Sequence, residues 1–579
     1  MIPFQQNAHR QARDLSGSWD FKMDPQGIGK KAKWFHGLKK PRKIPVPSSW
    51  NTQFADTSNY LGDAWYQLRF NHPQKLEGFR KFIRFGSVNY LAEIWLNGHF
   101  QGMHEGGHLP FVFEISKHIK KGVNLLTVRV NGDLAPDRVP PGKVPFDPRD
   151  AFANSFNPPA SFDFFPFCGI QRPVHLLSLP QEPLQDVTVT TSLEGKTGKV
   201  KVVVQGPAKP GLSCRLTLNG FGWTASSGGP FKSGHFDSEI SVPQAKLWAP
   251  GSPYLYQLKV ELLSGRQAAD QMDFPVGIRT VNVKGRQLLL NGKPIFLKGF
   301  GRHEDDPKTG RYLPPATLKK DYQNMKWIGA NSFRTSHYPY SDEDMAMADR
   351  LGYLVIDETP AVGLFFHPLG LKKRLQLCRQ FTREMIERDK NHPSVILWSI
   401  ANEPHSKRPA AIPFFKNLAQ LARQLDPTRP LTLASYMGAT EESFNFLDVV
   451  CVNRYFGWYS EPGDLDSAIP RLSKDLDAIY KKFKKPVLMT EFGADAMPGS
   501  HSNPPIMFSE EYQAEMISRY WKVLKGKNYV GGAHIWNLND FRTAQATHRP
   551  NAMNYKGVFT QGRKPKLAAH RLRILWFTK

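Results

Sequence analysis

Hydrophobic residues in the first third of the chain occur in short segments that often alternate with polar residues. Within residues 10–180, turn signals such as Asn97-Gly98 and Asn131-Gly132 separate these segments. Alternation places every second side chain on the same face of a strand. The expected strands cover residues 15–21, 64–70, 81–85, 92–96 and 125–130. This pattern predicts a jelly-roll β-sandwich over residues 1–182.

A second β-rich region follows, and after Gly277 the pattern changes. Segments 199–204, 213–218 and 256–262 favour an immunoglobulin-like sandwich of the usual ~100 residues, at 183–277. Beyond Gly277, short apolar segments alternate with helical stretches, which is typical of βαβ units. The expected strands are 295–299, 332–334, 353–356, 395–400, 431–435, 449–453, 487–490 and 532–535. Eight strands over about 300 residues predict a (β/α)₈ barrel at 278–579.

Two of the barrel strands end in a glutamate. An uncharged segment that begins at Val395 leads into Asn402-Glu403-Pro404, as expected for a parallel strand buried on both faces. Because Pro404 disfavours helix at the residue before it, we expect Glu403 to leave the strand in an extended conformation. The segment 485–493 has the same pattern, and its expected strand ends next to Glu491. The intervening strands make these the fourth and seventh strands of the barrel.

The carboxyl ends of barrel strands meet over one mouth, where the chemistry of such folds is located. Hydrolysis of a glycosidic bond requires two carboxyl groups that flank the bond. One protonates the leaving oxygen, and the other attacks the anomeric carbon or activates water. Their neighbours must separate the two pKa values. Glu403 and Glu491 are therefore the candidate pair. A non-catalytic carbohydrate-binding protein is the alternative from a different class.

The chain is strongly basic. It contains 77 Lys+Arg and 51 Asp+Glu, a formal net charge of +26. Such a charge attracts anionic partners such as acidic polysaccharide, nucleic acid or acidic membranes, or it serves only for solvation. No nucleic-acid-binding motif is present, so we expect no nucleic-acid partner. No apolar run approaches the ~20 residues of a membrane helix, so we expect no membrane partner.

Targeting signals and cysteines add little. The residues Met1–Gln6 do not form a signal peptide, so the sequence leaves the compartment open between cytoplasmic and, after removal of a signal, periplasmic or secreted. The four cysteines, Cys168, Cys214, Cys378 and Cys451, have no CxxC spacing. They are expected to be free thiols in hydrophobic cores, with no metal site.

Over nearly its whole length the chain resembles glycoside hydrolase family two, and within it the β-glucuronidases. The matching motifs lie at 299–305, 331–340, 355–358, 388–394, 398–404, 452–459 and 490–495. The resemblance implies an exo-acting retaining β-glycosidase with Glu403 as acid/base and Glu491 as nucleophile. Two carboxyl groups and contacts to the sugar ring suffice for this reaction, so we expect no metal or organic cofactor. The resemblance also implies a homodimer or homotetramer.

The resemblance also assigns substrate contacts. Asn554 and Lys556 match the Asn-x-Lys pair that holds the carboxylate of the sugar in β-glucuronidases, and Arg549 is the neighbouring arginine, one residue further away than the pattern requires. A lysine beside an amide donor gives a carboxylate charge-assisted hydrogen bonds. The same pair would also accept a galacturonide, so a β-galacturonidase stays open, and a β-galactosidase is the remaining alternative. Further family positions around the sugar ring are Asp163, His337, Asn402, Tyr455, Tyr459 and Trp536.

The segment after the third barrel strand is short. In many gut-bacterial relatives a long loop covers the active site at this point, whereas here 361–370 leads almost directly into the next helix. We therefore expect an open mouth that accepts bulky aglycones, including the remainder of a uronic-acid-terminated oligosaccharide such as a glycosaminoglycan fragment.

Overall fold

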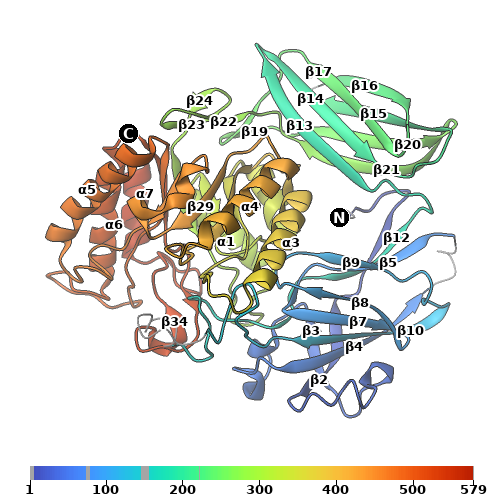
Figure 1. Cartoon of the computed structure of the whole chain (residues 1–579), viewed down its shortest axis with the longest axis horizontal. Helices are drawn as coiled ribbons and strands as arrows, with labels where there is room; N and C mark the ends of the chain where they lie inside the picture. Colours follow the sequence, from blue (N-terminus) through green and yellow to red (C-terminus); the bar gives the residue numbers. More distant parts are fainter. Residues whose placement is uncertain (1–4, 73–77, 145–155, 221, 578–579) are drawn as a thin grey trace.

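The computed structural model describes residues 5–72, 78–144, 156–220 and 222–577. The chain forms a jelly-roll sandwich, an immunoglobulin-like sandwich and a (β/α)₈ barrel, as Figure 1 shows in blue, green and yellow to red. The predicted fold class is thus confirmed. Residues Met1 to Phe4, on which part of the signal-peptide analysis rests, lie outside the described residues.

The jelly roll consists of two main antiparallel sheets. The strand orders are β1-β12-β5-β9 and β3-β2-β4-β10-β7-β8. Their inward-facing side chains form one core around Trp19, Trp50 and Tyr66, each 0% exposed. The strands are β1 (Gln11–Asp14), β2 (Gly17–Asp24), β3 (Arg42–Val46), β4 (Asp63–His72), β5 (Arg80–Phe85), β7 (Leu91–Leu96), β8 (His99–Glu105), β9 (Phe111–Glu114), β10 (Gly122–Asn131) and β12 (Val174–Leu179).

The immunoglobulin-like sandwich packs the sheet β13-β14-β17 against the sheet β16-β15-β20-β21. Alternating apolar positions such as Val200, Val202 and Val204 face the shared core. The strands are β13 (Asp186–Glu194), β14 (Thr197–Gln205), β15 (Leu212–Gly220), β16 (Trp223–Pro230), β17 (His235–Val242), β20 (Tyr256–Ser264) and β21 (Gln267–Val276).

Eight parallel strands close the barrel, and each observed bound lies within two residues of the predicted one. They are β25 (Leu297–Gly301), β26 (Ser332–Arg334), β27 (Leu354–Glu358), β28 (Val395–Asn402), β29 (Leu431–Ser435), β30 (Val450–Asn453), β31 (Val487–Glu491) and β32 (Val530–Ile535). The helices are α1 (Pro315–Ile328), α2 (Asp342–Leu351), α3 (Leu371–Asp389), α4 (Ala411–Leu425), α5 (Leu465–Phe483), α6 (Glu510–Lys525) and α7 (Leu567–Phe577). Apart from Lys298 in β25, the residues of the barrel strands are buried, as their apolar runs predict.

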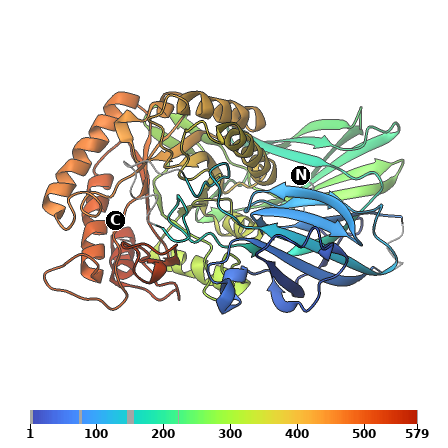
Figure 2. The same ribbon diagram turned by 60° about the horizontal axis from the view of Figure 1, so that its bottom comes forward.

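The jelly roll extends one segment, 156–168, across to the barrel (Figure 2). Asn157 exchanges two backbone hydrogen bonds with Gln545, each 2.9 Å long, and the amide of Phe165 donates to the carbonyl of Arg542 at 2.9 Å. On the opposite side, Gly363 of the short segment after β27 packs against the Ser161 carbonyl. Asp163 is therefore held over the barrel by backbone contacts on both sides of it in the sequence.

All four cysteines are buried and unbridged, as predicted. The residues that the structure describes include no helix that is both long and apolar enough to cross a membrane.

Candidate functional site

Glu403 follows directly after β28, the fourth barrel strand, but its backbone differs from the sequence prediction. Its φ is 44°, in the left-handed region rather than extended, so the expectation drawn from Pro404 was wrong. The Glu403 amide donates to the carbonyl of Ala434 in β29 at 2.8 Å. This bond to the neighbouring strand fixes the turn that a local rule about proline does not anticipate.

Glu491 is the last residue of β31, the seventh strand, and two donors hold its carboxylate. The Tyr455 hydroxyl donates to Oε2 at 2.8 Å, and the guanidinium of Arg334 forms an ion pair with Oε1. Burial and the Glu491 charge raise the pKa of Tyr455 well above its usual value, so this phenol remains a donor. Glu491 is therefore held as an oriented carboxylate.

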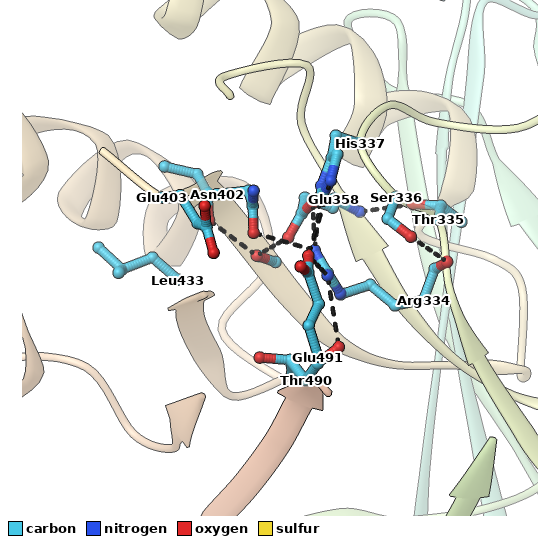
Figure 3. Close-up of polar contacts among 12 residues, drawn as sticks. Arg334, Thr335, Ser336, His337, Glu358, Asn402, Glu403, Leu433, Thr490 and Glu491 are labelled. Carbon is cyan, nitrogen blue, oxygen red and sulfur yellow. Dashed lines mark hydrogen bonds and ion pairs between the residues drawn. The ribbon is translucent and has the colours of Figure 1, made fainter. Parts of the chain in front are cut away.

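Arg334 lies between Glu358 and Glu491 in Figure 3. Its Nη1 donates to Glu358 Oε1 at 2.6 Å and to Asn402 Oδ1 at 3.3 Å. Burial alone would lower the pKa of Arg334, but the Glu358 and Glu491 carboxylates outweigh it and raise the pKa. His337 Nδ1 lies 2.9 Å from Glu358 Oε1, and its Nε2 lies 3.6 Å from Glu491 Oε1. The guanidinium thus joins the ends of the second, third, fourth and seventh strands.

Glu403 has a different environment from Glu491. Burial and the nearby Glu491 charge raise the pKa of Glu403 to about 7, although Asn453 opposes the shift by donating to Oε1 at 2.7 Å. Asn453 also donates to Asn402 Oδ1 at 3.2 Å. One carboxyl group that holds a proton near neutral pH therefore faces one carboxylate fixed by a cation. This arrangement can transfer a proton and supply a nucleophile at the same bond.

Trp536 directly follows β32, the eighth strand, and we call its ring the floor of the site. Its ring stacks on His337 with 4.9 Å between ring centroids and an interplanar angle of 20°. Gly493, two residues after Glu491, has a φ of 153°, and a Cβ there would lie 2.3 Å from the Trp536 carbonyl oxygen. Only glycine fits at this position, because a side chain would displace Trp536.

A second cluster lies beside this floor and contains the remaining predicted contacts. Lys556 forms an ion pair with Asp495, and its Nζ lies 3.1 Å from the Tyr459 hydroxyl. Arg549 pairs with Asp163, donates to the Tyr459 hydroxyl at 2.8 Å and lies 3.5 Å from Asp495. Lys556, Arg549 and Asp495 are each 1% exposed, whereas Tyr459 is 49% exposed.

Asn554 joins the same cluster. Its side-chain amide donates to Asp163 Oδ2 at 3.0 Å, and its Oδ1 accepts from the Lys556 amide at 3.0 Å. Arg549 lies in the cluster in spite of its irregular spacing in the sequence. The result is a buried lysine and arginine, partly neutralised by two aspartates, with Tyr459 and Asp163 as the exposed edge.

Four residues of the site were not among the sequence candidates: Arg334, Glu358, Asn453 and Asp495. Three of them are the last residues of barrel strands β26, β27 and β30, a signal that the sequence contains. Asp495 lies four residues beyond Glu491, and only its ion pairs with Lys556 and Arg549 identify it. Among the described residues, no group of three or more His, Cys, Asp or Glu is placed to hold a metal ion.

Three family models together match nearly the whole length of the chain. Residues 12–180 match the sugar binding domain of glycosyl hydrolases family 2, residues 183–279 match a further family 2 domain, and residues 281–578 match the family 2 TIM barrel domain. A β-glucuronidase of Paenibacillus borealis is 40% identical, with 98% of this chain and 97% of that protein covered.

Solved structures give the same result. A β-glucuronidase from an uncultured Clostridium sp. superposes with a TM-score of 0.92 at 38% identity, covering 100% of this chain and 99% of that one. The β-glucuronidase of Ruminococcus gnavus in complex with D-glucuronic acid superposes with a TM-score of 0.92 at 36% identity, with the same coverage.

Proposed function

Because this chain belongs to glycosyl hydrolases family 2, we propose that it is an exo-acting, retaining β-glucuronidase that releases terminal β-D-glucuronic acid. The observation that carries the proposal is the joint placement of three groups. Glu403 directly follows the fourth barrel strand, Glu491 ends the seventh, and the buried Lys556 lies in the adjoining cluster. No metal or organic cofactor takes part in the proposed reaction.

In the first step Glu403 donates its proton to the leaving oxygen while Glu491 attacks the anomeric carbon. The raised pKa of Glu403, about 7, keeps the proton available at neutral pH. Tyr455 and Arg334 hold the two oxygens of Glu491, which fixes the direction of attack. The product of this step is a covalent glycosyl–enzyme ester, and the aglycone leaves as an alcohol.

In the second step Glu403, now a carboxylate, removes a proton from water, and the water displaces Glu491 from the anomeric carbon. Two displacements at one carbon retain the configuration. Retaining enzymes place their carboxyl groups about 5–5.5 Å apart, and we expect that separation in the complex with substrate.

Selection of a uronide rests on Lys556 and Asn554, together with Arg549 of the same cluster. Lys556 is 1% exposed, so a bound carboxylate would meet its charge without screening by water. A neutral hydroxymethyl group would leave that charge without a new partner, which disfavours β-galactosides. A galacturonide presents the same carboxylate and differs at C4, so β-galacturonidase is the second candidate.

The other predicted residues surround the ring. Asn402 lies beside Glu403 and is assigned to the 2-hydroxyl, a contact that strengthens in the transition state. Asp163, with 24% of its side chain exposed, is assigned to ring hydroxyls, and Tyr459 to the edge of the pocket. His337 and Trp536 form the stacked floor beneath the sugar.

Aglycone tolerance follows from the short connection between β27 and α3. Only residues 359–370 separate Glu358 from Leu371, and much of this segment is buried against the rest of the protein. We expect turnover of glucuronate-terminated oligosaccharides as well as small glucuronides. Cleavage of a small aryl glucuronide without detectable cleavage of the oligosaccharide contradicts this expectation.

A panel of aryl β-glycosides that differ only at C4 and C6 tests the central proposal. The glucuronide should have the highest kcat/KM. A preference for the galacturonide selects the second candidate, a preference for the galactoside removes the role of Lys556, and binding without turnover indicates a carbohydrate-binding protein. The expected homodimer or homotetramer is tested by light scattering on the intact chain.

A further inference from the structure

One excursion of the jelly roll combines a high density of positive charge with a fixed conformation. It covers residues 25–45, from the end of β2 into β3, and contains seven Lys or Arg residues and no Asp or Glu. It lies at the outer margin of the jelly roll, in dark blue at the bottom of Figure 1. A solvated tail of this composition would be unstructured, whereas this segment is anchored along its length.

Backbone groups of the excursion are bound by side chains of the sheet. The Asp24 carboxylate accepts from the amides of Ile28 and Gly29, both at 2.8 Å, and from Trp65 Nε1 at 3.0 Å. Gln67 accepts from the Leu38 amide at 2.8 Å and donates to the Trp34 carbonyl at 2.8 Å. The lysines are therefore displayed on an ordered backbone.

Aromatic packing anchors the same segment. Phe35 stacks on Trp95 with 5.6 Å between centroids and an angle of 9°, and Trp34 meets Trp65 edge-on at 6.0 Å. Lys22 Nζ lies 4.4 Å from the Trp34 ring and donates to the Lys39 carbonyl at 3.1 Å. Through Lys22, the backbone at Lys39 is therefore held next to Trp34, which directly follows Lys33 in the chain.

Three of the seven basic side chains already have carboxylate partners. Lys30 pairs with Glu93 at 2.5 Å, Arg42 with Asp56 at 2.8 Å and Lys43 with Asp20 at 2.7 Å. Four others, Lys31, Lys33, Lys39 and Lys40, are exposed, and no carboxylate in the described part of the chain pairs with them.

A row of three histidines leads from the excursion to one more exposed lysine, Lys117. The His36 ring packs on Gly98, where a Cβ would lie 2.4 Å from its Cε1. His99, the next residue, stacks on His118 with 4.5 Å between centroids. Desolvation, His99 and Lys117 together lower the pKa of His118, so the positive charge at this end of the row is that of Lys117, the residue before it. We call Lys31, Lys33, Lys39, Lys40 and Lys117 with these three histidines the basic jelly-roll surface.

We propose that the basic jelly-roll surface binds an acidic polysaccharide chain, separately from the barrel site. Lysines on an anchored backbone lose less conformational freedom when they meet a polyanion than lysines on a mobile tail, so each contributes more. Phe100 and Met103 on the adjacent β8 are 52% and 54% exposed and offer apolar area to sugar rings.

The choice of polysaccharide rests on the proposed function, since an enzyme that removes terminal glucuronate benefits from being held on a polymer that contains it. The attraction itself rests only on charge. An intact chain with this surface should bind such a polymer even when the barrel site is inactive.

The test uses the intact chain and heparin as the probe. Affinity is measured by equilibrium binding in buffers of increasing salt, for the wild type and for Lys31→Glu/Lys33→Glu/Lys39→Glu/Lys40→Glu. A matched control, Lys201→Glu/Lys232→Glu/Lys293→Glu/Lys319→Glu, changes the net charge equally at scattered exposed lysines. We expect the cluster variant to lose at least about tenfold in affinity with a shallower salt dependence, and the control to lose less than about threefold.

Enzyme kinetics and competition by duplex DNA complete the test. Both variants should retain the wild-type kcat/KM for a small aryl glucuronide, which shows that they fold and that the barrel site is separate. Equal affinity loss in both variants overturns the proposal, because the attraction is then a property of total charge. Competition by duplex DNA as effective as heparin at equal charge also overturns it. A wild type that binds heparin but hydrolyses no glucuronide contradicts the proposed function alone.

Discussion

Lys556 and Asp495 form an ion pair in which both side chains are 1% exposed. The pKa of Asp495 is lowered because Lys556 and Arg549 outweigh the effect of burial, so this carboxyl is an anion in the free protein. A substrate carboxylate therefore enters a cluster in which the lysine already has one partner. Asp495 holds Lys556 in place and prevents the cost of an unpaired buried ammonium.

Replacement of Lys556 by alanine should reduce kcat/KM for an aryl glucuronide by about 10²–10³-fold. The value for the matching aryl glucoside should change by less than about threefold, because that substrate has no carboxylate. The variant Lys556→Ala/Asp495→Asn is the control, since it removes the pair without leaving Asp495 unbalanced. Equal losses on both substrates in both variants would refute the carboxylate role.

The pH profile of kcat/KM should have a basic limb near pH 7. Burial and Glu491 favour the protonated form of Glu403, so the acid persists up to its pKa of about 7 and is lost above it. The Asn453 amide opposes this shift, so Asn453→Ala should raise the pKa further and move the basic limb to higher pH. A limb that stays in place or moves to lower pH contradicts the assignment of Glu403 as the acid.

Glu491→Gln should reduce kcat by roughly 10⁴-fold or more, because the amide cannot form the ester intermediate. Binding of glucuronic acid, measured by calorimetry, should change much less. With the wild type, proton NMR at early times should show the β-anomer of the released sugar. Initial release of the α-anomer would exclude a double displacement.

Gly493→Ala should reduce kcat/KM at least about tenfold, since the new methyl group collides with the Trp536 carbonyl and displaces the floor under the sugar. Gly37→Ala is the control, because a Cβ at Gly37 meets nothing within 4 Å. Both variants should be folded by circular dichroism. Wild-type activity in Gly493→Ala would mean that the position of Trp536 does not matter.

The barrel was predictable because its strands are buried on both faces, so each appears as a short uncharged run. The strand β29 was predicted with both ends correct, and Glu403 and Glu491 appeared as charges at the ends of such runs. The jelly-roll strand order was not predictable, because β1 pairs with β12 and β4 with β10 across long stretches of chain. Pairing of that kind depends on the whole sandwich rather than on any local pattern.

The conformation of Glu403 and the role of Arg334 were not predictable for a related reason. Pro404 gave a local expectation, yet the hydrogen bond from Glu403 to Ala434 of the next strand decides the backbone. Arg334 could be seen at the end of β26, but its bonds to Glu358 and Glu491 depend on the register of three strands around a closed barrel. Sequence shows which residues reach the mouth, and three-dimensional register decides which of them meet.

The segment that carries Asp163 has a consequence for the history of the chain. Asp163 comes from the jelly roll, and its ion-pair partner Arg549 comes from the far end of the barrel region. A barrel of this kind cannot exchange its N-terminal module for an unrelated one and keep the same sugar pocket. Substitutions at this contact in one module therefore have to be matched in the other. A shortened chain without the jelly roll would keep Glu403 and Glu491 but lack the part of the pocket wall that Asp163 provides.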